Sequence, residues 1–146
     1  MNTSDFTTTI LVDQTPEEVF NAVNNVCSWW QGQIEGSTNK LNDEFTYRMG
    51  DIHFSKQKIV EIIPCKKVVW LVTESKLNFI NLKSEWTGTT ISFEIAEQDS
   101  KTQLRFTHVG LNPEIECYGA CSNGWDQLVQ QSLLSLITIG KGKKVF

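Results

Sequence analysis

Long apolar runs are missing from this sequence. No stretch approaches the roughly 20 consecutive apolar residues that a membrane-spanning helix requires, so we expect no membrane span. The first nine residues are polar and contain neither the basic part nor the apolar part of an export signal. The sequence therefore predicts a cytoplasmic protein.

An excess of basic charge is missing as well. The chain has 13 Lys and Arg residues against 17 Asp and Glu residues, and its net charge is −4. Proteins that bind nucleic acids concentrate positive charge for the phosphate backbone. The one basic cluster here is Lys141, Lys143 and Lys144, a glycine-spaced end of the chain that we interpret as solvated. We expect no nucleic-acid partner.

A metal-site spacing of the cysteines is missing too. Cys27, Cys65, Cys117 and Cys121 form no CxxC pair and no zinc-ribbon pattern. Cys117 and Cys121 share a face if they lie on a helix and could coordinate a metal, but no nearby His or second Cys pair would complete four ligands. Because free cysteines often behave as small buried hydrophobic residues, we interpret these as structural or cavity-lining thiols. We expect no metal and no cofactor.

Sequence motifs for catalysis are also missing. The serines occur in no GxSxG elbow, and the chain has neither a Gly-rich phosphate loop nor an HExxH helix. Glu35, Glu44 and Glu61 are scattered over expected strands and turns, and we interpret them as solvated. These absences argue against an enzyme, although a single inward acid or base could still act.

What the sequence does contain is a mixed pattern of strands and helices within one domain, residues 1–146. A chain of 146 residues with 40% hydrophobic content can bury one substantial core. Alternation over residues 6–12 predicts a first strand. Thr15 as a cap and Pro16 at the first helical position predict a short helix, and a second short helical turn is expected at 26–30.

Strands are predicted for the middle of the chain. Turn signals separate alternating apolar runs, and because consecutive hairpins favour antiparallel pairing we expect an antiparallel sheet. The segment 52–63 is ambiguous, since Ile59 and Ile63 break the parity of its other apolar residues; a β-bulge would explain the break. The polar stretch 73–83 predicts irregular structure.

The strongest periodic signal predicts a long amphipathic helix after a break at 110–113. Gly140 is a natural stop. Gly119 and Gly124 predict kinked or interrupted first turns, and Glu114 and Glu116 are expected in the first turn. The apolar positions, spaced by three and four residues, are Tyr118, Cys121, Trp125, Leu128, Val129, Ser132, Leu133 and Leu136. Packed across the sheet, this helix completes an α+β fold.

Short motifs in a fixed order carry a resemblance to a known family over nearly the whole chain. They are 15–20 (TPEEVF) with Val23, Trp29-Trp30, 60–64 (VEIIP) with Trp70, 86–90 (WTGTT), 102–108 (TQLRFTH) and Gly124-Trp125. The chain resembles the START-like (SRPBCC) superfamily, which includes the birch-pollen allergen fold. Within it, the chain is similar to single-domain homologues of the heat-shock protein 90 ATPase activator.

The resemblance implies a helix-grip fold. In that fold a curved antiparallel sheet of about seven strands wraps around the long C-terminal helix, with two short helices after the first strand and a cavity between sheet and helix. Members include lipid and small-molecule binders and polyketide cyclases. The eukaryotic activator also has a separate N-terminal domain, and because this chain begins directly at its first expected strand, we expect that domain to be missing.

Aromatic residues supply the candidate binding site. The chain has five Trp and eight Phe residues. Ordinary core packing explains most of them, but pockets for apolar ligands are also lined by aromatic rings with a few polar groups. We expect the near half of the long helix to face the cavity and its far half to anchor the fold. The hypothesis for the lining is Trp30, Phe54, Trp70, His108, Tyr118, Cys121 and Trp125.

His108 is the most informative polar residue in that set. Strand alternation places it on the inward face with Leu104 and Phe106. Three interpretations remain open: a histidine satisfied by a backbone or helix partner, a ligand contact, or an acid–base group. His53 follows a turn, and we expect it on the surface.

Three functions follow from these observations. The first is a binding protein for an apolar or aromatic small molecule or lipid. The alternatives are a cyclase- or hydratase-type enzyme that uses His108 with Tyr118 as a hydrogen-bond donor, and a co-chaperone-like modulator of a heat-shock ATPase. The expected partners are an apolar small molecule and, for the last alternative, a chaperone ATPase, and the chain is expected to be a monomer or homodimer.

Overall fold

The computed structural model describes residues 5–30, 32–81 and 83–145. The first four residues of the polar N-terminal segment lie outside the described residues. Strands are followed by a helical C-terminal part, in the order that the sequence predicts. The elements are β1 (Phe6–Val12), α1 (Pro16–Asn24), η1 (Val26–Ser28), β2 (Gln33–Gly36), β3 (Glu44–Met49), β4 (His53–Ile63), β5 (Lys67–Leu77), β6 (Thr90–Gln98), β7 (Lys101–Val109), α2 (Tyr118–Gln127), η2 (Leu128–Leu133) and α3 (Leu134–Ile139).

The seven strands form one antiparallel sheet in the order β1-β7-β6-β5-β4-β3-β2. The predicted α+β helix-grip fold is thus confirmed. Strands β2 to β7 pair with their neighbours in sequence, as expected of consecutive hairpins. The exception is β1, the first strand, which pairs with β7, the last. In this pair Phe6 lies opposite His108.

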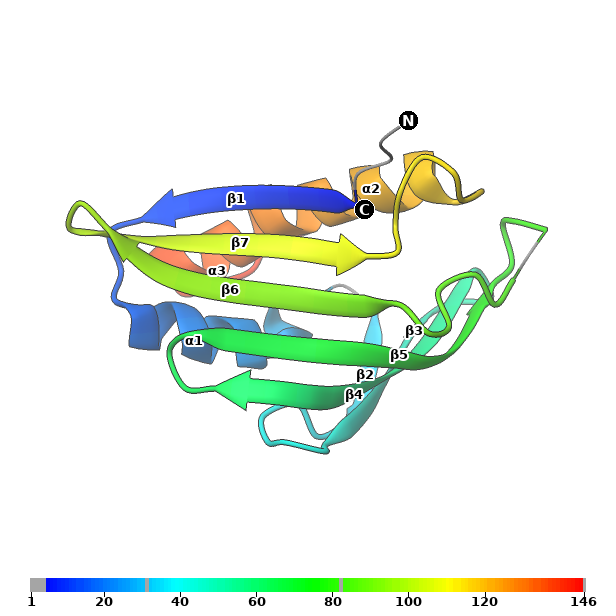
Figure 1. Ribbon diagram of the computed structural model, residues 1–146, viewed down its shortest axis with the longest axis horizontal. Helices are drawn as coiled ribbons and strands as arrows, with labels where there is room; N and C mark the ends of the chain where they lie inside the picture. Colours follow the sequence, from blue (N-terminus) through cyan, green and yellow to red (C-terminus); the bar gives the residue numbers. More distant parts are fainter. Residues whose placement is uncertain (1–4, 31, 82, 146) are drawn as a thin grey trace.

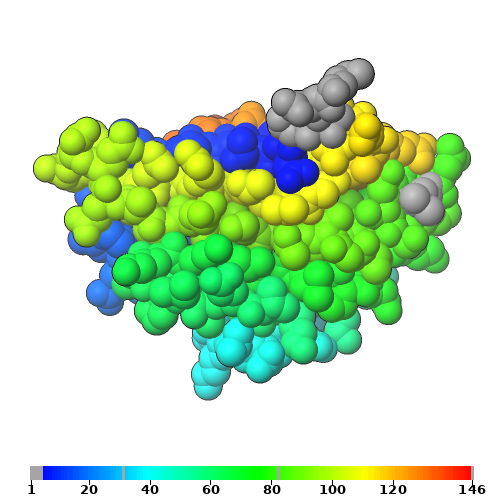
Figure 2. Space-filling model, in the orientation of Figure 1, coloured from blue at the N-terminus to red at the C-terminus, as the bar shows by residue number. Residues whose placement is uncertain are grey.

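All helices lie on one face of the sheet (Figure 1). Thr15 caps α1 as predicted, with its side-chain oxygen accepting from the backbone N–H of Glu18 at 3.2 Å. The helical layer contacts the sheet through α1 against β6 and through η2 and α3 against β1. The opposite face of the sheet covers most of the surface seen in Figure 2, where the C-terminal helix emerges only along the upper edge.

The bulge predicted in the segment 52–63 is present, and it explains why the apolar residues there do not keep a single alternation. Ile59 pairs with Trp70 while Glu61 pairs with Val69, so Val60 is an extra residue on β4. Before the bulge, every second residue from His53 to Ile59 faces inward, and Ser55, Gln57 and Ile59 are fully buried. Phe54 therefore lies on the outer face, and its predicted place in the cavity lining is wrong.

A second irregularity lies on β5. Thr73 has no partner on β4, because Val72 pairs with Gln57 and Glu74 with Lys56. The strand then continues to Leu77, so the prediction of irregular structure from residue 73 is wrong for its first five residues. Residues 73–77 have two inward side chains, Ser75 and Leu77. Because Ser75 is polar, the sequence shows no apolar alternation in this segment.

The C-terminal helix is continuous from Tyr118 to Ile139, but it begins later than predicted. Residues 112–117 form turns, so Glu114 and Glu116 precede the helix rather than occupying its first turn. The helix departs from α geometry at Leu128–Leu133, where it forms the wider π turn η2, and not at its glycines. Gly140 ends it in a left-handed conformation, as predicted. Among the described residues, no helix has both the length and the apolar character needed to cross a membrane.

Candidate functional site

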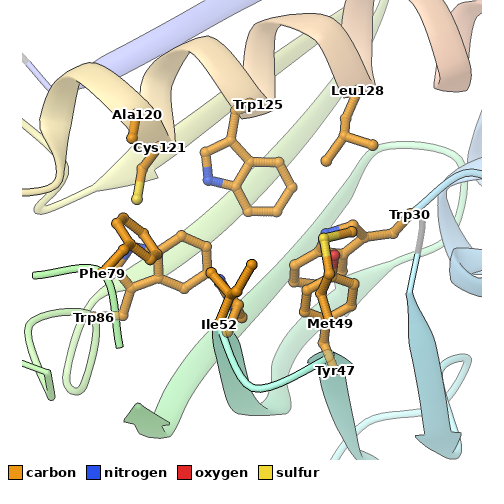
Figure 3. A pocket seen from close by; sticks show the side chains of 12 residues that line it. Trp30, Tyr47, Met49, Ile52, Phe79, Trp86, Ala120, Cys121, Trp125 and Leu128 are labelled. Carbon is orange, nitrogen blue, oxygen red and sulfur yellow. The ribbon is translucent and has the colours of Figure 1, made fainter. Parts of the chain in front are cut away.

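A pocket of about 160 Å³ lies between α2 and one end of the sheet. Figure 3 shows Trp125 and Leu128 reaching down from the helix, opposite Tyr47 and Met49 on β3 and Ile52 in the turn before β4. Two exposed apolar side chains, Ile52 and Phe79, stand at its rim. The residues that line the pocket are Trp30, Tyr47, Met49, Ile52, His53, Phe79, Trp86, Ala120, Cys121, Gly124, Trp125 and Leu128.

One wall of the pocket is supplied by the loop between β5 and β6. The loop is tied to β5 at both ends, by Leu77 N–H donating to the Lys83 carbonyl at 2.8 Å and by Gly88 N–H donating to the Val72 carbonyl at 2.8 Å. The Glu85 carboxylate fastens it to the segment before α2, accepting from the backbone N–H groups of Glu116 and Cys117. This anchoring directs Trp86 inward, where it is buried.

Aromatic rings define the shape of the pocket. The Trp30 and Tyr47 rings are stacked with centroids 4.0 Å apart. Trp125 lies over them, 5.0 Å from Trp30, and it stacks on Trp86 at 5.8 Å. Stacked and edge-on rings at these separations stabilise one another beyond the effect of burial alone. The pocket therefore has flat, rigid walls.

The pocket carries no net charge. Among the described residues that line it, none is Asp, Glu, Lys or Arg. Burial lowers the pKa of His53 to about 4, so its imidazole is neutral near neutral pH. Burial raises the pKa of Tyr47 to about 12, an effect that its hydrogen bond with Trp30 partly offsets. Both titratable rings of the lining are thus uncharged.

A chain of polar side chains continues from His53 along the inward face of β4. His53 Nε2 and Ser55 Oγ are 3.2 Å apart, and the Gln57 amide donates to the same Ser55 oxygen at 2.5 Å. Gln57 Oε1 is buried with no hydrogen-bond partner among the described residues. A buried acceptor without a partner costs free energy of folding. This polar chain therefore stabilises the fold less than the apolar core around it.

His108 lies behind the pocket rather than on its surface. Its ring faces inward, as strand alternation predicted, and is fully buried. Trp125 Nε1 donates to His108 Nδ1 at 3.0 Å, so the ring proton is on Nε2, which then donates to Thr89 Oγ1 at 2.8 Å. Thr89 in turn donates to the Trp86 carbonyl at 2.6 Å. Burial, with a smaller contribution from His53, lowers the pKa of His108 to about 3.

This arrangement matches the interpretation of His108 as a histidine satisfied by a helix partner. Both ring nitrogens have protein partners and none is directed at the pocket. The same contacts fix the indole of Trp125, whose other side lines the pocket. We therefore assign His108 to the support of the pocket wall.

The structure brings together only part of the predicted lining. Trp30, Cys121 and Trp125 line the pocket. Trp70 lies in the closed core, Tyr118 is half-buried on α2 outside the lining, and Phe54 packs on the outer face beneath the Arg48 guanidinium at 4.8 Å. The near half of the helix faces the pocket, through Ala120, Cys121, Gly124 and Trp125.

Sequence reasoning missed several residues that line the pocket, some on strands and some in turns or loops. His53 is half-buried and lines the pocket, so its predicted surface position is wrong. Its ring is edge-on to Trp86 at 4.6 Å and to Tyr47 at 4.9 Å. One signal in the sequence could have placed it, because His53, Ser55 and Gln57 alternate along one face of β4. That face is polar, however, and therefore resembles a solvated face. Tyr47, Met49, Ile52, Phe79 and Trp86 were likewise not predicted.

A curved antiparallel sheet that holds one long helix, with a pocket at one end, defines a START-like (SRPBCC) protein. More particularly, the chain belongs to the family described as activator of Hsp90 ATPase homolog 1-like protein, whose sequence profile matches residues 13–137. No curated protein sequence matches the chain significantly.

Solved structures show the same fold. The Aha1 dimer from Colwellia psychrerythraea has 25% identity and a TM-score of 0.76, covering 95% of this chain and 99% of that one. The protein SSP2350 from Staphylococcus saprophyticus has 15% identity and a TM-score of 0.71, with 98% of each chain covered. DynU16, from the dynemicin biosynthetic locus, has 15% identity and a TM-score of 0.67; the match covers 97% of this chain and 51% of that one.

Proposed function

We propose that this protein binds a small, uncharged, largely planar apolar molecule in the pocket between α2 and the sheet. The observation that carries the proposal is the lining itself, which is built from aromatic and aliphatic side chains without a formal charge. Ligand pockets in proteins typically have this character, with few polar groups among many apolar ones.

The size of the pocket limits the ligand. A cavity on the order of 150 Å³ accommodates one benzene ring, and this pocket of about 160 Å³ also opens past Ile52 and Phe79. A ligand of one or two fused rings would lie between the flat walls and extend toward the rim. Burying a carboxylate there would be costly, because the lining residues that the structure describes include no cationic side chain to pair with it.

A matched pair of ligands tests the proposal. 2-Naphthol and 2-naphthoate share one ring system, but only the second is charged at neutral pH. We expect 2-naphthol to bind with one site per chain and 2-naphthoate to bind about tenfold more weakly or worse, measured by isothermal titration calorimetry. Equal binding of both compounds, or binding of neither, would contradict the proposal.

Two phenylalanine variants on the same helix locate the binding site. Ala120→Phe adds a ring where the side chain lines the pocket, and should abolish 2-naphthol binding. Asn123→Phe adds the same ring at an exposed position of α2 outside the lining, and should leave binding unchanged. Loss of binding in both variants would place the ligand elsewhere.

Modulation of a heat-shock ATPase is a second candidate function, favoured by the family match over residues 13–137. In this case the outer face of the sheet, on which none of the described helices packs, would dock the chaperone (Figure 2). Pull-down with the chaperone at low and at moderate salt tests it. Retention at both salt concentrations would support the function, and no retention at either would count against it.

A further inference from the structure

Two of the four thiols meet where α2 begins. Cys117 precedes the helix and Cys121 lies one turn later, joined by a hydrogen bond of 2.8 Å from the Cys121 N–H to the Cys117 carbonyl. Their exposed fractions are 1% and 8%. Figure 3 shows the Cys121 sulfur directed away from the helix toward Trp86 and Phe79, and Cys121 lines the pocket.

The spacing of this thiol pair suits a bridging atom better than a disulfide. Residues four apart on a helical turn have Cβ atoms about 5–6 Å apart. A disulfide needs a Cβ separation of about 3.5–4.5 Å, so direct oxidation would require the turn to unwind. A single atom bonded to both sulfurs lengthens the bridge and leaves the turn intact.

The surroundings of the pair favour an uncharged product. The contact with the Cys121 thiol is the largest cause that raises the pKa of Cys117, and burial and the nearby Glu85 carboxylate act in the same direction. All three effects oppose thiolate charge. A divalent metal would also need further ligands, and in the described part of the chain no group of three or more His, Cys, Asp or Glu side chains gathers to hold one.

We propose that Cys117 and Cys121 together bind a trivalent arsenical that carries one apolar organic substituent. In the hydrated form, R–As(OH)₂, two As–O bonds break and two As–S bonds form. Each hydroxyl leaves as water with one thiol proton, and arsenic remains trivalent, so no oxidant or reductant is needed. The product, R–As(S-Cys)₂, is neutral, as the buried setting of the pair requires.

The pocket supplies the place for the organic substituent. Because Cys121 lines the pocket, a substituent on arsenic would lie among the same aromatic walls that the proposed ligand contacts. Formation of the As–S bonds does not depend on the proposed function, but the preference for an aromatic substituent rests on it. Inorganic arsenite would place a hydroxyl group in this apolar space and would find no third thiol there.

Phenylarsine oxide, added to the full-length reduced protein, tests the inference. The variant Cys27→Ala/Cys65→Ala keeps only the thiol pair. Intact-mass analysis should show one phenylarsenic group bound with the loss of two hydrogens, reversed by 2,3-dimercaptopropanol and not by a monothiol. The absence of this adduct in the double variant would overturn the inference.

Single variants assign the bonds to the pair. Cys117→Ala and Cys121→Ala should each lose the adduct that survives a monothiol, whereas Cys27→Ala should keep it. Arsenite should compete at least about tenfold more weakly than phenylarsine oxide, given the apolar surroundings; equal affinity would overturn the role given to the pocket. Binding of 2-naphthol to the wild-type protein without arsenic is measured separately, so failure of the thiol site alone is distinguishable from failure of the proposed function. If a single variant does not fold, the double variant still decides.

Discussion

The interior has two aromatic regions that are built from similar residues and behave differently. In the closed region, Trp29, Phe45, Trp70 and Phe93 are each at most 1% exposed and fill the space between sheet and helices. Their ring centroids lie 4.9–6.4 Å apart around Trp70. In the open region, the rings of Trp30, Tyr47, Trp86 and Trp125 surround the pocket.

The difference between the two regions comes from what covers them, not from residue type. The closed region lies under strands that are paired on both sides. The open region is bounded only partly by strands, β3 and β4, and otherwise by the turn at Ile52 and by the loop that carries Phe79 and Trp86. Side chains from a turn and a loop can surround a volume without filling it, so the same aromatic composition yields a core at one end and a pocket at the other.

The largest expected effect is on the closed region. Trp70→Ala should lower the free energy of unfolding by about 3–5 kcal/mol, because a large side chain with no exposed surface leaves a cavity that its rigid neighbours cannot close. Urea denaturation followed by circular dichroism measures it. A loss below about 1 kcal/mol would mean that this region can collapse as readily as an ordinary surface site.

The two histidines give the next largest effect, through pH. Their pKa values in the folded chain, about 4 for His53 and about 3 for His108, lie below the ordinary value of 6.5. The unfolded chain therefore binds more protons, so stability is complete above pH 6.5 and falls as the pH drops toward the folded values. For the fully buried His108 the loss should be about 2 kcal/mol by pH ~5.

Replacing the histidine of the open region separates the two contributions. His53→Gln should flatten, without abolishing, the fall in unfolding free energy between neutral pH and pH ~5, measured by urea denaturation at each pH. The remaining slope belongs to His108, which is held by Trp125 and Thr89. An unchanged slope in His53→Gln would show that His53 already has its ordinary pKa in the folded protein.

A matched pair of tryptophan substitutions isolates one hydrogen bond. Trp125→Phe removes the donor to His108 Nδ1, whereas Trp70→Phe removes an indole N–H that has no hydrogen-bond partner among the described residues. Both side chains are buried. Trp125→Phe should cost about 1 kcal/mol more than Trp70→Phe in urea denaturation, because it leaves a buried acceptor unpaired. The opposite order would contradict the assignment of His108 as a support for Trp125.

The smallest effect on stability is expected at the rim of the open region. Phe79 is 43% exposed, so Phe79→Ala should change the free energy of unfolding by less than about 0.5 kcal/mol. The same variant should weaken 2-naphthol binding measurably by calorimetry, because Phe79 lines the pocket. A large loss of stability would mean that the rim is part of the core and that the two regions are not separate.

Sequence patterns predicted the elements well where local chemistry determines them. The cap at Thr15, the stop at Gly140 and the bulge in β4 all follow from properties of the residues themselves. Which side chains of β4 point inward could not be predicted in the same way. Its inward residues, Ser55 and Gln57, are polar, and the extra residue Val60 reverses the parity that the apolar residues suggest.

The candidate site was predicted best on the long helix, where the periodic signal is strongest. Cys121 and Trp125 were found because helical spacing identifies their face. Phe79 and Trp86 were missed because their positions depend on long-range hydrogen bonds of the loop, including those that the Glu85 carboxylate accepts from residues 116 and 117. No local pattern encodes such contacts, so the wall they form is visible only in three dimensions.

The π turn η2 has a consequence for how the position of the pocket is encoded. A π turn contains about one residue more than an α turn, and each helical residue advances the direction of a side chain by about 100°. The extra residue is taken up within that one turn, so the residues on either side keep the faces they would have in a regular α-helix. Deleting one residue within Leu128–Leu133 would therefore restore α geometry and leave Trp125 on the pocket and Ile137 on the core. Deleting a second residue would have no wider turn left to absorb it, and would rotate α2 relative to α3 by about 100°. The alignment of the pocket wall with its anchor should thus tolerate the loss of one residue in this segment, but not of two.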